Sequence, residues 1–439
     1  MNFEVQTHTF GCKVNTYDSG LIEKNLKREG AFEFARKVHV LNSCAVTSEA
    51  TQQASRLIRK IKSENPSSLV VVTGCAAQVD TDSFLSSQAD LIVANSHKSE
   101  LPNLIQQLIQ GRTESRVFKR NIFKNEELEI GGGVESEHTR SFLKIQDGCN
   151  SFCSFCIIPY ARGKSRSISI TDLCNRVVEL YEQGLREVVL TGVHVGDFDD
   201  EGRKLEDLLQ ALLVRTPMPR FRLSSLEPIE VSDRLLELYQ DPRMCAHFHM
   251  SIQSANSDVL KDMKRKYGQR EVRQSLEKIA KNVPHAFVGM DVIAGFPTES
   301  FEKFEDTYLC LADLPWTRLH VFPYSERPGT RAAELMEQIP FSERKNRARR
   351  LRELSADRYQ DWGFQQVGKT QKALLFSKPN SKSQGLTREY CNIRFDSAES
   401  LDSLKKITGE VPVRLKSFEW LGGSSQDGRF LAEVIQESL

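Results

Sequence analysis

The sequence of 439 residues contains ten cysteines, and three of them, Cys149, Cys153 and Cys156, lie within eight residues. We call these three the loop triplet, because they follow a strand-like run, FLKIQ, at the point where α/β barrels carry their active sites. The CxxxCxxC spacing lets one loop supply three thiolates to a four-iron cubane cluster and leaves the fourth iron open. The alternative is a zinc knuckle. Structural zinc prefers four ligands, however, and the next nearby cysteine, Cys174, lies in a predicted helix.

Three further cysteines, Cys12, Cys44 and Cys75, form what we call the amino-terminal triplet and recur at intervals of 32 and 31 residues. Each follows a run typical of a buried strand, and the interval equals about one strand–helix–strand unit. Because parallel strands end at the same edge of a sheet, we expect the three thiols to converge there. The pattern predicts a second cubane with an open iron. The alternative is that these are ordinary buried cysteines.

Composition restricts the class of protein. The chain is 39% hydrophobic and 27% charged, which is typical of a soluble globular protein and excludes wholesale disorder. Sixty Lys and Arg against 59 Asp and Glu leave a formal charge of +1, so any nucleic-acid site must be a local patch. No apolar run approaches the roughly 20 residues that cross a bilayer, and the amino terminus does not resemble a signal peptide. We therefore expect a cytoplasmic protein with no membrane partner and with reduced thiols.

The first part of the chain, residues 1–113, alternates strand-like and helical runs, which predicts a small doubly wound α/β domain. Its strands are expected within 5–10, 38–42, 69–73 and 91–95, and its helices within 16–30 and 48–64. The polar, glycine-bearing stretch 111–137 is predicted to be a linker.

The second part, residues 135–366, repeats this alternation six times. Its strand-like runs are FLKIQ, EVVLTGV, RFRLSSL, HFHMSIQ, GMDVIAGF and RLHVFPY. With helices between most of them, they predict an open (β/α)6 barrel, a partial version of the eightfold barrel. A strongly basic helix over 342–362 ends this part, and it is expected either to bind RNA phosphates or to be a solvated helix with i,i+4 ion pairs. Short strands and turns in 367–439 predict a small all-β barrel.

Longer motifs surround the cysteines: FGCKVNTYDS, NSCAVT, TGCAAQ, KIQDGCNSFCSFCIIPYARGKSRS, MSIQSANSDVLKDMKRKYG, DVIAGFPTES and FPYSERPGTRAAE. Over essentially the whole chain these motifs resemble the radical S-adenosylmethionine (SAM) methylthiotransferases. The resemblance implies an amino-terminal methylthiotransferase domain with an auxiliary cluster in 1–113, a radical SAM core in 135–366, and a TRAM-like RNA-binding β-barrel in 367–439, where the match is weaker.

The resemblance also implies an activity. Family members replace a C–H bond by C–S–CH3 with two [4Fe–4S] clusters and S-adenosyl-L-methionine. One SAM gives its methyl group to sulfur at the auxiliary cluster, and a second is cleaved reductively at the radical cluster. By this resemblance the loop triplet holds the radical cluster and the amino-terminal triplet holds the auxiliary cluster. The implied partners are a tRNA, a one-electron donor and a source of sulfur, and the sequence identifies neither of the last two.

Other residues are expected, by the same resemblance, to line the cofactor cleft. They lie at or near the ends of barrel strands or after the cluster loop: Thr191, Gly192, Ser251, Gln253, Ile293, Gly295 and Arg162. Arg162 suits a cofactor carboxylate or an RNA phosphate. The alternative for the strand-end residues is ordinary packing, and for Arg162 it is a solvated loop cation.

The substrate branch is predicted from GVHVGDF at 192–198, which resembles the family branch that acts on threonylcarbamoyladenosine in tRNA. That substrate carries a carboxylate, so His194 or a nearby arginine is expected to supply a donor or a cation. The predicted function is conversion of threonylcarbamoyladenosine next to the anticodon to its 2-methylthio derivative. The alternatives are methylthiolation of isopentenyl-adenosine or of a ribosomal-protein aspartate, a non-catalytic iron–sulfur electron-transfer protein, and an RNA-binding protein with zinc.

Overall fold

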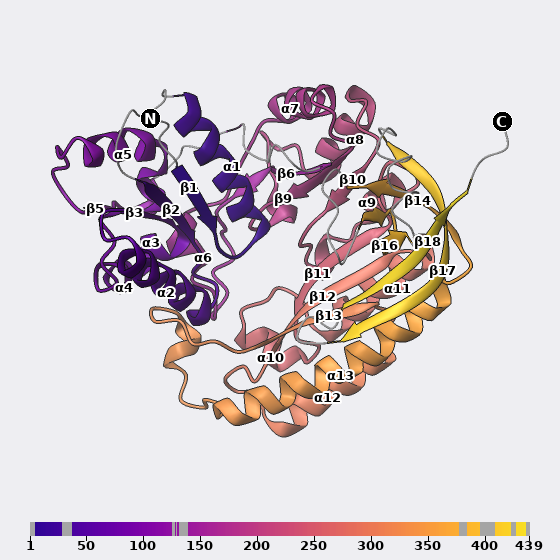
Figure 1. Cartoon of the computed structure of the whole chain (residues 1–439). Helices are drawn as coiled ribbons and strands as arrows, with labels where there is room; N and C mark the ends of the chain where they lie inside the picture. The colour runs from indigo at the N-terminus through magenta and orange to yellow at the C-terminus, as the bar shows by residue number, and fades with distance from the viewer. Residues whose placement is uncertain are drawn as a thin grey trace.

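The structure is a computed structural model that describes residues 5–28, 37–124, 128, 130, 139–376, 384–395, 409–422 and 427–435. Figure 1 shows an amino-terminal α/β part, a central barrel of strands and helices, and a carboxyl-terminal β-barrel on the side of the molecule away from the amino-terminal part. This confirms the predicted fold class. Part of the predicted linker, at 125–127, 129 and 131–137, lies outside the described residues. Within the described ranges, no helix has the length and apolar character needed to cross a membrane.

The amino-terminal sheet has five parallel strands in the order of the chain. They are β1 (Val5–Thr9), β2 (Val38–Ser43), β3 (Leu69–Gly74), β4 (Leu91–Val93) and β5 (Val117–Phe118). The helices are α1 (Lys13–Arg28), α2 (Ser48–Glu64), α3 (Cys75–Val79), α4 (Thr81–Leu85) and α5 (Leu101–Ile109). Strands β2 and β3 are buried at every position, because α1 and α5 cover one face of the sheet and α2 to α4 the other.

Strand β5 was not predicted, and it extends the sheet beyond residue 113 into the stretch expected to be a linker. It has only two residues and pairs with β4. A strand this short gives no alternating pattern, so sequence periodicity cannot reveal it.

The central part contains six main parallel strands, as predicted. They are β6 (Arg140–Lys144), β9 (Glu187–Thr191), β10 (Phe221–Leu223), β11 (His247–Gln253), β12 (Phe287–Ala294) and β13 (Arg318–Pro323). The first three and the last three form separate sheets, and single bridges between Phe221 and Met244 and between Leu226 and Met250 join them into an open barrel. The helices α7 (Ile170–Glu182), α8 (Leu205–Arg215), α9 (Asp233–Leu238), α10 (Ser257–Asp262), α11 (Gln269–Asn282) and α12 (Phe301–Asp313) lie between the strands along the chain. A single apolar core fills the barrel and the layer beneath its helices.

A short hairpin closes the base of the cysteine loop. Strand β7 (Gln146–Asp147) pairs with β8 (Arg166–Ser167) in antiparallel fashion, and the short helix α6 (Ile158–Arg162) lies between them. The loop triplet is therefore held on an excursion with both ends fixed, rather than on a free loop.

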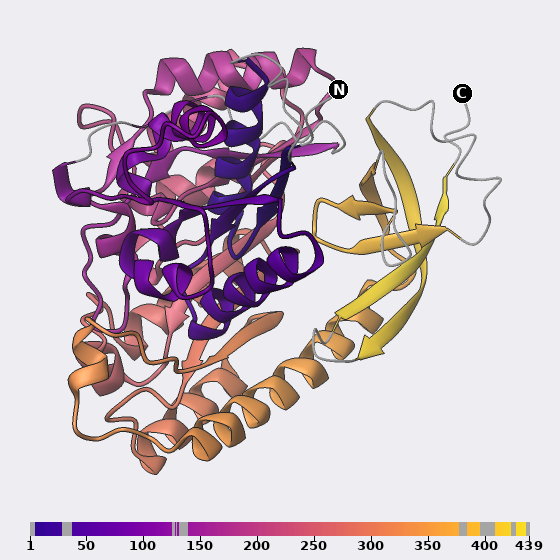
Figure 2. The ribbon, with the colours of Figure 1, turned by 60° about the vertical axis from the view of Figure 1, so that its left-hand side comes forward.

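The long helix α13 (Phe341–Gln366) leads from the barrel to the carboxyl-terminal β-barrel (Figure 2). That barrel is closed, in the order β14-β15-β16-β18-β17. Its strands are β14 (Thr370–Leu375), β15 (Gly385–Thr387), β16 (Asn392–Phe395), β17 (Glu410–Gly422) and β18 (Asp427–Val434). It packs against the amino-terminal ends of the central strands, where the fully buried Arg220 donates to Glu187 of β9, Glu410 of β17 and the carbonyl oxygens of β15.

Candidate active site

The amino-terminal triplet lies at one edge of its sheet, as predicted. Because β1, β2 and β3 are adjacent and parallel, the cysteines that follow them emerge side by side. Cys44 and Cys75 are buried and Cys12 is exposed, and none of the three forms a disulfide. The three thiols influence one another's charge, since Cys75 and Cys12 both raise the pKa of Cys44.

Glycines make this convergence possible. Gly11 has φ +91°, and a Cβ there would lie 2.5 Å from Sγ of Cys44. Gly74 has φ +95°, and a Cβ there would lie 2.4 Å from the backbone oxygen of Ser43. At both positions only glycine combines the left-handed backbone with the close approach of the neighbouring strand.

The loop triplet lies at the carboxyl end of the first barrel strand, between β7 and β8. All three cysteines are partly buried and reduced. The amide of Ser151 donates to Sγ of Cys149 at 3.4 Å, and the Cys149 thiol lies 4.0 Å from Nδ1 of His194. Phe155, which precedes Cys156, packs against the barrel core.

Both triplets fit an iron–sulfur cluster by the chemistry of their donors. Burial, together with the neighbouring thiols, raises the pKa of Cys44 and of Cys156 to about 12. Thiolates on neighbouring strand ends or in one loop repel one another in the absence of a cation, and bound iron would remove that cost by coordinating them. The four cysteines outside the triplets are buried in other elements: Cys174 in α7, Cys245 just before β11, Cys310 in α12 and Cys391 just before β16.

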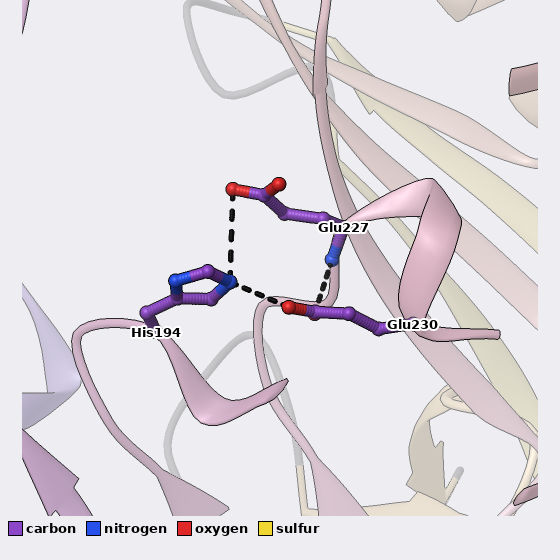
Figure 3. A group of neighbouring side chains, drawn as sticks. All are labelled: His194, Glu227 and Glu230. Carbon is purple, nitrogen blue, oxygen red and sulfur yellow. Dashed lines mark hydrogen bonds and ion pairs between the residues drawn. The ribbon is translucent and has the colours of Figure 1, made fainter. Parts of the chain in front are cut away.

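Beside the loop triplet, His194 forms a compact group with Glu227 and Glu230 (Figure 3), whose potential ligand atoms lie within 4.8 Å of one another. His194 follows β9, and its Nε2 lies 2.5 Å from Glu230 and 3.7 Å from Glu227. Burial alone would lower the pKa of His194, but hydrogen bonds to Cys149 and Glu230 raise it to about 11. Glu227 also pairs with the largely buried Arg265, so both carboxylates are neutralised by cations within the protein.

This arrangement corrects one expectation. His194 or a nearby arginine was predicted as a donor to the substrate carboxylate, but one ring nitrogen of His194 faces Glu230 and the other faces Ser151 and Cys149. The ring therefore acts within the cluster site. Neither Glu227 nor Glu230 was singled out in the sequence, because only the tertiary structure brings the β10–α9 connection to His194.

Arg162 also differs from its predicted surroundings. It is 3% exposed, so it does not face an external phosphate. Its Nε donates to Sγ of Cys75 at 3.1 Å, Nη1 donates to both oxygens of Asp147, and Nη2 donates to Asn15 and Asp18. These three nitrogens are thus occupied by Cys75 and α1 of the amino-terminal domain and by Asp147 at the base of the cysteine loop, which leaves none of them for the carboxylate of a bound cofactor.

Asp18 and Asp147 anchor this buried network further. Lys144 lies 2.7 Å from Asp18 and 3.1 Å from Asp147, and Lys98 lies 2.9 Å from Asp18. Burial opposes ionisation of both carboxyls, but these cations together with Arg162 hold the pKa values of both well below the ordinary range. The network lines a pocket of about 60 Å³ between the amino-terminal domain and the barrel.

The remaining residues expected at the cofactor cleft lie at or near the carboxyl ends of β9, β11 and β12. Thr191 and Gly192 are buried, and a Cβ at Gly192 would lie 3.0 Å from Oε1 of Gln146. Ser251 is partly buried, and Gln253 adopts φ +64° at an irregularity of β11. A left-handed backbone at a non-glycine residue stores strain of a kind that collects at functional sites.

On the fifth barrel strand, the two candidates have structural partners. Ile293 is partly buried and packs against the barrel core. The amide of Gly295 donates to Glu299, and a Cβ there would lie 2.5 Å from Arg344 of α13. Glycine is required at this position so that α13 can approach the strand end.

Most of the arginines of α13 are engaged inside the protein. Arg344 and Arg347 are buried, and Arg347 pairs with Glu299 at 2.9 Å. Arg349 forms an exposed i,i+4 pair with Glu353 at 2.8 Å. Of the two readings of this helix, ion pairing is the one that these contacts match.

Comparison with known proteins gives the family. A model described as the radical SAM superfamily matches residues 143–311, and one described as uncharacterized protein family UPF0004 matches 4–94. Threonylcarbamoyladenosine tRNA methylthiotransferase MtaB of Aquifex aeolicus (strain VF5) is 35% identical over 92% of this chain and 99% of its own length. MtaB of Bacillus subtilis (strain 168) is 32% identical over 99% and 97%.

A more distant relative is tRNA-2-methylthio-N(6)-dimethylallyladenosine synthase of Buchnera aphidicola subsp. Baizongia pistaciae (strain Bp), 28% identical over 85% of this chain and 87% of its own. Among solved structures, the radical S-adenosylmethionine methyltransferase TsrM of Kitasatospora setae, with cobalamin and a [4Fe–4S] cluster bound, shares the fold with a TM-score of 0.58. That match has 13% identity and covers 76% of this chain and 77% of TsrM. The chain therefore belongs to the radical SAM methylthiotransferase family, as its cysteine motifs predicted, and is an enzyme that uses SAM and [4Fe–4S] clusters.

Proposed function

We propose that this enzyme methylthiolates threonylcarbamoyladenosine next to the anticodon of tRNA. The observation that carries the proposal is the pair of three-cysteine groups. Each group lies at the carboxyl ends of parallel strands and leaves one corner of a cubane open. Arg162 connects the two groups. The choice of base is supported by relatives named for threonylcarbamoyladenosine, which are 32–36% identical. Relatives named for dimethylallyladenosine are 28–30% identical.

In this proposal the loop triplet holds the radical cluster and the amino-terminal triplet holds the auxiliary one. When bound, the clusters and SAM supply the one-electron chemistry, the sulfur and the methyl group. The chain supplies the ligands, the glycines at 11 and 74 that let them converge, and the His194 group that contacts Cys149. Thr191, Gly192, Ser251, Gln253, Ile293 and Gly295 are proposed to line the SAM cleft.

We further propose that each domain has the role that the family resemblance implies. Residues 1–113 carry the auxiliary cluster, 135–366 form the radical SAM core, and 367–439 contact the tRNA. The closed barrel of the last part supports this, because small β-barrels are common oligonucleotide-binding modules. A one-electron donor and a source of sulfur complete the reaction, and a tRNA substrate favours the cytoplasm as the place of action.

The test uses the anaerobically reconstituted enzyme with SAM, a reductant and one of two tRNAs, carrying either threonylcarbamoyl- or isopentenyl-adenosine. We expect mass spectrometry to detect the 2-methylthio nucleoside only in the tRNA that carries threonylcarbamoyladenosine. A pocket whose hydrogen-bond donors pair with the substrate carboxylate would bind an apolar isopentenyl group poorly, because those donors would then have no partner. Product from the isopentenyl tRNA alone would contradict the substrate assignment and leave the family intact.

The second candidate, an electron-transfer protein, makes a different prediction in the same assay. It would bind clusters but would release neither 5′-deoxyadenosine nor methionine from SAM. The open corner that each three-ligand site leaves favours the enzyme, since an electron carrier is expected to complete its cluster with a fourth cysteine.

A further inference from the structure

Arg162 is the residue through which the two cysteine triplets are connected. It ends α6, six residues after Cys156, and its Nε lies 3.1 Å from Sγ of Cys75, which follows β3. Both groups are buried, at 3% and 2% exposure. A buried guanidinium that donates to sulfur makes a charge-assisted hydrogen bond of well-defined direction.

The same guanidinium closes the base of the cluster loop. Asp147 directly precedes Gly148, whose amide donates to it at 2.8 Å, and Arg162 follows the loop and holds both oxygens of Asp147 at 2.9 and 3.0 Å. Nη2 reaches Asn15 at 2.6 Å and Asp18 at 3.1 Å on α1. One side chain thus contacts Asp147 at the base of the loop triplet, Cys75 of the amino-terminal triplet, and helix α1 of the amino-terminal domain.

Hydrogen bonds to the sulfur of a cluster ligand raise the reduction potential, because the reduced cluster carries more negative charge and is stabilised more by the donor. We propose that Arg162 is a positioning residue that couples the two cluster sites. Its Nε–H donates to Cys75 and raises the potential of the auxiliary cluster, while Nη1 fixes the loop that holds the radical cluster. This inference rests on the cluster assignment made under the proposed function.

A merely structural arginine would affect folding without a specific effect on the auxiliary cluster. The matched control is Lys144, which carries the same charge and pairs with Asp18 and Asp147 in the same buried network. Lys144 donates to the carboxylates of Asp18 and Asp147, whereas Arg162 also donates to a cysteine. Replacing either residue removes one positive charge from this network, but of the two only Arg162 donates to sulfur, and Arg162→Lys keeps the charge while it changes that donor.

The experiment uses the full chain with Cys149, Cys153 and Cys156 replaced by alanine, so that only the amino-terminal triplet binds a cluster. Iron and sulfide analysis of this parent comes first, and about four irons per chain are expected. The midpoint potential is then measured by a redox titration followed by electron paramagnetic resonance, in the parent and in Arg162→Gln, Arg162→Lys and Lys144→Met.

We expect Arg162→Gln to lower the midpoint potential of the auxiliary cluster by about 59 mV, the value for a one-electron couple. At a fixed applied potential, this shift changes the ratio of oxidised to reduced cluster about tenfold. Arg162→Lys should restore part of the shift, and Lys144→Met should show less than a third of it. Equal shifts in Arg162→Gln and Lys144→Met, or no shift in either, would overturn the proposal.

Two further outcomes remain informative. Loss of iron from Arg162→Gln but not from Lys144→Met supports the coupling. In that case Arg162→Lys must show an altered Fe–S(Cys) stretching frequency by resonance Raman spectroscopy. An unchanged frequency overturns the hydrogen bond. A parent chain without iron overturns the cluster assignment itself, and that result is read before any Arg162 variant is compared.

Discussion

At the residue scale, the cysteines of the two triplets differ in their surroundings. Cys149 is partly buried, which by itself raises the pKa of a thiol, yet hydrogen bonds with His194 and Ser151 bring its pKa below the ordinary value. Cys44 and Cys156 have no such donors of equal strength, and their pKa values are raised to about 12. Cys149 is therefore the thiol of these three that most readily becomes a ligand.

Replacement of single cysteines should separate the two half-reactions. We expect Cys149→Ala to abolish release of 5′-deoxyadenosine from SAM, and Cys75→Ala to retain that release while forming no methylthiolated product. Each should lower iron content by about half, from about eight to about four per chain. Cys174→Ala is the matched control, because this thiol is buried in α7 away from both triplets and should keep full iron. Full product from Cys75→Ala would show that the amino-terminal thiols are only core residues.

At the scale of elements, the strand-to-helix junction after β3 positions Cys75. Gly74 precedes α3 with a left-handed backbone, and an alanine Cβ there would lie 2.4 Å from a backbone oxygen that cannot move aside without breaking β2. Gly111 also has a positive φ, of 66°, but a Cβ there meets nothing within 4 Å.

These two glycines offer a direct comparison. We expect Gly74→Ala to lower the free energy of unfolding by about 2–4 kcal/mol and to reduce iron at the amino-terminal triplet, since both the backbone and the neighbouring strand are strained. Gly111→Ala should cost only about 1 kcal/mol, from the backbone alone, and should leave iron unchanged. Urea denaturation and iron analysis measure the two effects. Equal costs at both sites would show that β2 yields to the added carbon.

The last strand of the central barrel carries a second element-scale property, a partly buried histidine. His320 on β13 has its pKa lowered to about 4 by burial, although Asp291 opposes the shift. Because the unfolded chain takes up this proton near pH 6.5 and the folded one does not, stability falls as the pH falls from about 6.5 towards 4.

For this site we expect the free energy of unfolding to drop by about 2 kcal/mol more between pH 7.5 and pH 5 in the natural chain than in His320→Gln. His285→Gln, which changes an exposed ring, should leave the pH dependence of the natural chain unchanged. Urea denaturation at the two pH values provides the measurement. Parallel pH profiles of the natural chain and His320→Gln would contradict the shift.

At the scale of the whole molecule, buried ion pairs attach the carboxyl-terminal barrel to the central one. Arg220 lies between Glu187 of the central barrel, at 2.6 Å, and Glu410 of the other, at 2.7 Å, with no exposed surface. Burial would raise the pKa of Glu187, but Arg222 and Arg220 hold it below the ordinary value. The carboxylate is therefore charged and depends on these arginines.

Removal of one partner leaves a buried charge uncompensated. We expect Arg220→Met to lower the free energy of unfolding by about 3–5 kcal/mol and to make the carboxyl-terminal barrel more accessible to protease. Arg349→Met, which breaks the exposed pair with Glu353, should cost less than about 1 kcal/mol. Limited proteolysis and urea denaturation report the two quantities. A stable, protease-resistant Arg220→Met chain would show that the apolar contacts alone hold the barrels together.

The sequence by itself determined the features that depend on periodicity and spacing. Buried runs of β-branched residues predicted the strands, and cysteines one strand–helix–strand unit apart predicted three thiols at one sheet edge, because parallel strands have a common direction. The loop triplet followed from its own local spacing. The closed carboxyl-terminal barrel followed from short strands separated by turn residues.

Only the tertiary structure decided the partners of the charged residues. Arg162 and His194 read as cations available to a ligand, yet they contact Cys75 and Glu230, which lie 87 and 36 residues away along the chain. The arginines of α13 could be read either as a phosphate-binding face or as a solvated helix with i,i+4 pairs, and the structure instead buries Arg347 against Glu299. A long charged side chain has no periodic signature, and its partner is set by the packing of domains, which the local sequence does not encode.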